Sequence, residues 1–72
     1  MIPKEILERY VDLKFFVEGS EAMYREFLKK TDYIGIKLAE ALFLGESLDE
    51  DYTEVLAAKK YAREQIRQLT NI

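Results

Sequence analysis

Residues that interrupt a helix are scarce in this 72-residue chain, which has one proline and three glycines. A protein built from many strands needs a turn every few residues, and these are too few. Apolar residues recur at helical spacing between the possible breaks, and they make up 49% of the chain, too many for a disordered segment. The sequence predicts one all-α domain over residues 1–72, a small three- to four-helix bundle. The breaks are Pro3, Gly19–Ser20, Thr31–Asp32 and Gly45–Asp49.

The first two predicted helices cover about residues 3–17 and 21–30. In the first, apolar residues form one stripe, with Gly19 as a natural end. Ser20 can cap the second, because its hydroxyl can accept from the free N–H groups of the first turn. The stripe of the first helix consists of Ile6, Tyr10, Leu13 and Val17, widened by Leu7 and Val11.

The third predicted helix, about residues 32–44, is apolar on nearly every side. After Asp32 its only charged residues are Lys37 and Glu40. A helix of this kind is typical of the centre of a bundle, so we expect it to be the most buried element. Thr31 either caps this helix or lies inside one longer, kinked helix over 21–44, and the sequence leaves both open. The residues expected in the core are Ile34, Leu38, Ala41 and Leu42.

The closing helix is predicted at about residues 50–69. Acidic residues crowd its start and basic residues fill its later turns, an order that suits the helix dipole. Ser47 and Glu50 have the spacing of a capping box, and Asp49 is an alternative cap. Its apolar stripe consists of Tyr52, Val55, Ala58, Ala62, Ile66 and Leu69.

Residues with catalytic or metal-binding chemistry are few. The chain has neither cysteine nor histidine, which removes thiol nucleophiles, disulfides, histidine proton transfer and cysteine or histidine metal ligands. It has no glycine-rich phosphate loop, and its two serines occupy helix-cap positions. We therefore expect no enzymatic activity, no catalytic residue, no cofactor and no bound metal.

Charged residues point to no particular ligand. The acidic run from Glu46 to Glu54 lacks the pattern of a calcium loop and suits a solvated helix start. Lys59, Arg63 and Arg67 share one side of the closing helix, but the net charge of -3 argues against nucleic-acid binding. No apolar run is long enough to span a bilayer, and the first residues lack a signal-peptide pattern. We expect an intracellular or virion location.

The remaining function class is protein binding. A domain this small, without disulfide or metal, has a thin stability margin that an added interface would widen. The apolar third helix has more apolar directions than three short neighbours cover. Phe15 and Phe16 lie off the stripe of the first helix, where they either fold under the following loop or form an exposed interface. Phe43 lies on a core-facing stripe and is expected in the core, but it is also a possible contact together with Leu44. We expect a homo-oligomer, or docking onto a larger protein, through these four residues.

One segment carries a family resemblance: Thr31-Asp32-Tyr33-Ile34-Gly35-Ile36-Lys37-Leu38-Ala39-Glu40. It resembles a Thr-Asp-Tyr-x-x-Ile-Lys-x-x-Glu motif of small bacteriophage proteins of Gram-positive hosts and of the C-terminal segments of some tail-fibre and tail-assembly proteins. There, as here, an acidic Gly-Glu loop and a closing helix rich in Ala, Arg and Gln follow. The resemblance covers about residues 28–72 and implies a helical interaction module of phage origin, without catalytic residues. Gly35 and Leu38 depart from the usual Lys and polar or aromatic residues, which makes this copy more apolar.

Two functions follow from these expectations. The first is a structural or assembly component of a phage virion that associates through its helices. The alternative is a small phage regulator that binds and inhibits a host protein, such as a defence enzyme. A symmetric oligomer favours the first function, and a stable monomer with an exposed aromatic patch favours the second.

Overall fold

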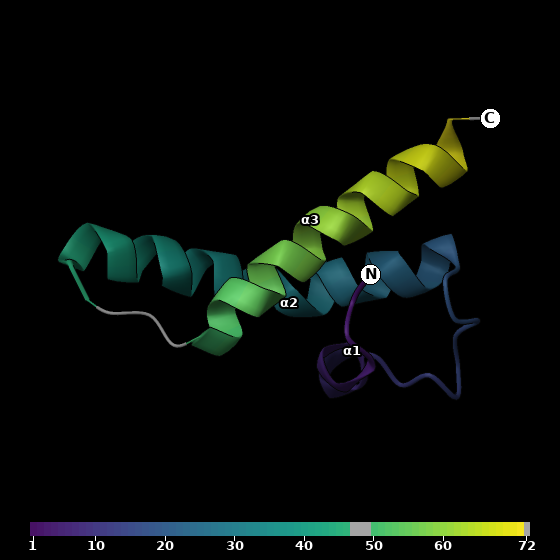
Figure 1. Cartoon of the computed structure of the whole chain (residues 1–72), viewed down its shortest axis with the longest axis horizontal. Helices are drawn as coiled ribbons and strands as arrows, with labels where there is room; N and C mark the ends of the chain where they lie inside the picture. The colour runs from purple at the N-terminus through teal and green to yellow at the C-terminus, as the bar shows by residue number, and fades with distance from the viewer. Residues whose placement is uncertain (47–49, 72) are drawn as a thin grey trace.

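The computed structural model describes residues 1–46 and 50–71, and its elements in these ranges are three α-helices without a strand. They are α1 (Lys4–Tyr10), α2 (Glu21–Leu44) and α3 (Glu50–Thr70), of 7, 24 and 21 residues. Together they hold more than two-thirds of the chain. In Figure 1, α3 crosses α2 obliquely, and α1 lies against the first part of α2. The all-α prediction is confirmed, with three helices in the described residues.

The first helix is shorter than predicted, because α1 ends at Tyr10 and not near residue 17. Val11 is extended, with φ -126° and ψ 130°, and its side chain is 2% exposed. Asp12 then accepts a hydrogen bond from the Lys14 N–H at 3.0 Å, a local turn that competes with the helix. The predicted stripe therefore fails at Val17, which is 76% exposed.

The second and third predicted helices are one uninterrupted helix, α2. Ser20 caps it as predicted, since its Oγ accepts from the Met23 N–H at 3.2 Å. Thr31 is fully buried inside the helix, and its hydroxyl donates to the Phe27 carbonyl at 2.7 Å. The interpretation of Thr31 as a helix cap is wrong. Its hydroxyl forms its hydrogen bond with a carbonyl of the preceding turn, and the helix continues through this residue. Gly45 ends α2 with φ 73°, a left-handed conformation that glycine adopts without strain.

The closing helix agrees with its prediction, since α3 spans Glu50–Thr70 against the expected 50–69. Its last turn is closed by Thr70, whose hydroxyl donates to the Ile66 carbonyl at 2.8 Å. The cap predicted at Ser47 or Asp49 lies outside the described residues.

The hydrophobic core lies where the first two-thirds of α2 pack against α1 and α3. Phe27 is at its centre with no exposed surface, and the Tyr10 ring meets it edge-on, with ring centroids 5.8 Å apart. Tyr24 meets Tyr61 of α3 in the same way at 6.2 Å. The buried apolar residues are Ile2, Ile6, Leu7, Val11, Met23, Tyr24, Phe27, Ile34, Leu38, Val55, Ala58 and Ala62.

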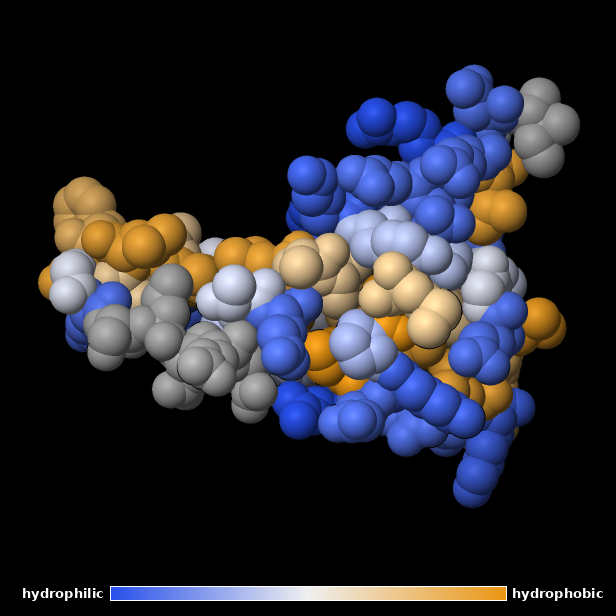
Figure 2. Space-filling view, in the orientation of Figure 1, coloured by the Kyte–Doolittle hydropathy of each residue, from blue (hydrophilic) through white to orange (hydrophobic). Residues whose placement is uncertain are grey.

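The last turns of α2 lie outside this core. Leu42 and Leu44 are each 67% exposed and Phe43 is 90% exposed, so the predictions that Leu42 and Phe43 are core residues are wrong. A helix of 24 residues is about 36 Å long, and the seven-residue α1 and the crossing α3 cover only part of that length. Figure 2 shows the result, a hydrophobic end of the molecule where α2 projects. The prediction that the third segment is the most buried element is therefore wrong, since its buried side chains are Ile34 and Leu38.

Candidate interaction surface

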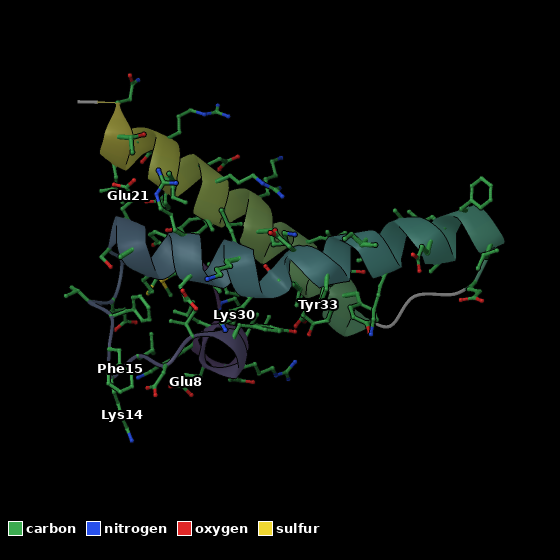
Figure 3. All side chains as sticks on the ribbon, turned by 180° about the vertical axis from the view of Figure 1, so that it is seen from behind. Glu8, Lys14, Phe15, Glu21, Lys30 and Tyr33 are labelled. Carbon is green, nitrogen blue, oxygen red and sulfur yellow. The ribbon has the colours of Figure 1, made fainter. Side chains whose placement is uncertain are left out.

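The four residues predicted to mediate binding lie in two places. Phe15, in the loop between α1 and α2, is 79% exposed, whereas its neighbour Phe16 is partly buried and packs on the core. Phe43 and Leu44 are at the C-terminal end of α2. Phe15 lies at the end of the molecule opposite the projecting part of α2, as Figure 3 shows. The structure therefore brings the predicted residues together in pairs, and the two pairs form no common face.

The larger apolar surface belongs to the end of α2, residues 36–44, which we call the α2 arm. Its exposed apolar residues include Ile36, at 62%, and Leu42, neither of which the sequence analysis proposed for binding. The signal for them was present in the apolar character of every side of this segment. The same apolar character predicts burial, because the sequence does not show how far the neighbouring helices reach along α2.

An open hollow of about 380 Å³ lies on the α2 arm, between Ala39, Glu40, Phe43 and Leu44. Small Ala39 leaves the space, and the larger apolar side chains border it. A hollow with this lining can accept an apolar side chain from another molecule.

Charged residues border the α2 arm on one flank. Lys37 Nζ lies 5.5 Å from the centroid of the Tyr33 ring, a cation–π contact one turn back along α2. Glu40 is exposed and lies three residues further along the same helix. The arm therefore carries one charge of each sign beside its apolar surface.

Lys59 of α3 fixes the crossing of α3 over α2, and so the point from which the arm projects. Its side chain is only 5% exposed, and its Nζ donates to the Thr31 carbonyl at 3.2 Å, with Asp32 Oδ1 3.8 Å away. Gly35 provides the space, because a Cβ at that position would lie 3.3 Å from Nζ. A buried ammonium needs such partners, since an unpaired charge in an apolar interior is costly. The first residues of the segment 31–40 thus hold α3 in place.

The other basic residues singled out from the sequence lie in solvent. Arg63 and Arg67 are exposed, and only Lys59 of the predicted basic row is buried. Most of the acidic run from Glu46 to Glu54 lies outside the residues whose side chains the structure describes. In the described part of the chain, no three acidic side chains are grouped so as to hold a metal ion.

Two tyrosines of the core have raised pKa values. Burial raises the pKa of Tyr10 above 10.0, and the side chain of Tyr33 raises it further through charge and a hydrogen bond. Burial also raises the pKa of Tyr24, with Tyr61 acting in the same direction. Both shifts are effects of packing around the buried part of α2, and they mark no reactive group on the α2 arm.

Two further findings bear on function. In the part of the chain that the structure describes, no helix is long and apolar enough to cross a membrane. A comparison of the chain with family models, curated proteins and solved structures found no match.

Proposed function

We propose that this chain is a non-catalytic interaction module that binds protein through the α2 arm, and that it serves as a structural or assembly component of a phage virion. One observation supports the binding role above all others: Ile36, Leu42, Phe43 and Leu44 are between 62% and 90% exposed on consecutive turns of one helix. Single exposed apolar residues are common on proteins, but a continuous cluster is typical of an interface.

The phage role rests on the resemblance of residues 31–40 to the tail-protein motif. Its residues divide between two tasks in this chain. Thr31, Ile34 and Leu38 are buried and hold α2 against the rest of the fold, whereas Ile36 and Lys37 are exposed on the α2 arm. A motif that joins a packing face to an exposed face suits a module that presents one helix to a partner.

A retention experiment in phage-infected or lysogenic cells tests the proposal. Tagged wild-type chain is compared with Phe43→Glu and with the matched control Phe15→Glu, at a residue of similar exposure at the other end of the molecule. We expect wild type and Phe15→Glu to retain virion or tail-assembly proteins and Phe43→Glu to lose them, and mass spectrometry of purified virions should detect the chain.

Other results would contradict the proposal in separable ways. Equal retention by Phe43→Glu would remove the α2 arm as the binding surface. Retention of a host enzyme, with loss of its activity and without virion proteins, would replace the assembly role by the inhibitory one. The host cytoplasm would then be the place of action rather than the virion.

A further inference from the structure

The α2 arm has a pattern that identifies a specific partner. We propose that it pairs with the α2 arm of a second copy of this chain, antiparallel, about a two-fold axis that passes near Ala39. The inference rests on the proposed function, because it uses the same surface, and it names the occupant of that surface.

The apolar contact consists of Ile36, Ala39 and Phe43. At about 100° per residue these three positions lie within about 60° of one another on α2. They face away from Ile34 and Leu38, which pack in the core and are at most 5% exposed. This outer stripe is therefore clear of the buried face of α2, and another helix can lie along it.

The order of side-chain sizes along the outer stripe suits antiparallel pairing. Ala39 lies near the middle of the stripe, where a small side chain allows two helices to approach closely. Phe43 and Ile36 lie on either side of it. In an antiparallel pair Phe43 of one copy packs beside Ile36 of the other copy, on both sides of the axis, so the large side chains fill the space beside the alanines.

Charge complementarity distinguishes a second copy from an unspecified apolar partner. Lys37 and Glu40 lie on the same flank of the outer stripe. A two-fold axis perpendicular to the helices places this flank of one copy beside the same flank of the other copy, and the two flanks run in opposite directions. With the axis near Ala39, Lys37 of each copy therefore lies close to the level of Glu40 of the other. A parallel pair would instead place this flank beside the opposite flank of the other copy, so Lys37 and Glu40 would not face each other.

The exposed apolar side chains of the outer stripe are also available to a second copy. Ile36 is 62% exposed and Phe43 is 90% exposed, so pairing along the stripe covers two large apolar side chains from each copy. Tyr33, half exposed and adjacent to Lys37, extends the surface. Phe15 and Val17, which are also exposed, lie in the loop between α1 and α2 and offer no helix to pair along.

Sedimentation equilibrium of the full chain over micromolar to millimolar concentrations tests the pairing, with four variants. Lys37→Glu and Glu40→Lys each place like charges across the axis twice, so we expect each to weaken dimerisation about tenfold, since exposed pairs are individually weak. The double variant Lys37→Glu/Glu40→Lys restores opposite charges and should return the dissociation constant to within about threefold of wild type. Arg63→Glu, at an exposed residue of α3, is the control for the change in net charge and should have no effect.

A mixing experiment gives the sharper result. Lys37→Glu chains carry two acids on the flank and Glu40→Lys chains carry two bases, so a mixture should form heterodimers in preference to either homodimer. Circular dichroism should show unchanged helicity in every variant, because the substituted side chains are exposed. Phe43→Glu should give monomer.

Separate outcomes overturn this inference and the proposed function. A monomer at every concentration, or a dimer that ignores both Phe43→Glu and the charge reversals, overturns the pairing. If that monomer still retains virion proteins through Phe43, the interaction module stands and only its self-pairing fails. If the arm forms the dimer but the chain retains no virion protein and is absent from virions, the pairing stands and the assembly role fails.

Discussion

Both ends of α2 carry large apolar side chains, but the two ends lie in opposite environments. Residues 21–38 carry the buried side chains of the helix, with Phe27 completely enclosed, whereas the α2 arm exposes Phe43 almost completely. The difference comes from the neighbours: α1 and α3 reach the first part of the helix and leave the last turns uncovered. An apolar side therefore shows that a helix needs a partner, and the tertiary structure decides whether that partner is in the same chain.

The largest expected contrast is between two phenylalanines of the same helix. Phe27→Ala should reduce the free energy of unfolding by about 3–5 kcal/mol, because it leaves a cavity in a closed core. Phe43→Ala should change it by less than about 0.5 kcal/mol at low protein concentration. Urea denaturation followed by circular dichroism measures both. Similar losses for the two variants would show that the α2 arm is packed within the chain.

A leucine pair tests where the burial ends. Leu38 is 5% exposed and Leu42, one turn later, is 67% exposed. Leu38→Ala should cost about 2–5 kcal/mol, whereas Leu42→Ala should cost less than about 1 kcal/mol. Thermal melting of the two variants at the same concentration makes the comparison. If Leu42→Ala melts as early as Leu38→Ala, the boundary of the core lies further along α2.

A smaller effect concerns the contact that fixes the crossing of α3. Replacing glycine by alanine in a helix interior stabilises the folded state by about 1 kcal/mol. At Gly35, however, the added Cβ would lie 3.3 Å from Lys59 Nζ and crowd the hydrogen bond from Nζ to the Thr31 carbonyl. A Lys59→Met background keeps most of the side-chain stem and removes the ammonium, which relieves that crowding. A double-mutant cycle by urea denaturation should therefore show a larger gain from Gly35→Ala in this background than in wild type. Equal gains in stability in the two backgrounds would mean that the Lys59 ammonium does not need the space that Gly35 leaves.

The smallest effect is a dependence on alkaline pH. Because burial raises the pKa of Tyr10 and Tyr24 in the folded state, the folded chain holds these protons more tightly than the unfolded chain. Their contribution to stability is complete below the unfolded pKa of 10.0 and is lost as pH rises through the raised folded values. The double variant Tyr10→Phe/Tyr24→Phe should flatten this loss in melting curves recorded above a pH of about 10. If the melting temperature of the double variant falls with pH as steeply as that of wild type, other groups cause the loss of stability.

The sequence by itself determined the all-α class, the cap at Ser20, the closing helix and, within α2, the core residues Ile34 and Leu38. These features depend on local hydrogen bonding and helical periodicity, and both are set by residues that lie close together in the sequence. It also indicated Phe43 and Leu44 as possible contacts, although their role in binding stays a prediction.

Only the tertiary structure decided the length of α1, the continuity of α2 and the exposure of Leu42 and Phe43. A threonine can cap a helix or bond back to the preceding turn, and at Thr31 the continuous helix is supported by Lys59, 28 residues away, which bonds the Thr31 carbonyl. Burial at the end of α2 likewise depends on how far α1 and α3 reach along it. Helical periodicity reports which side of a helix is apolar, whereas the position of a neighbouring helix depends on contacts between residues distant in sequence.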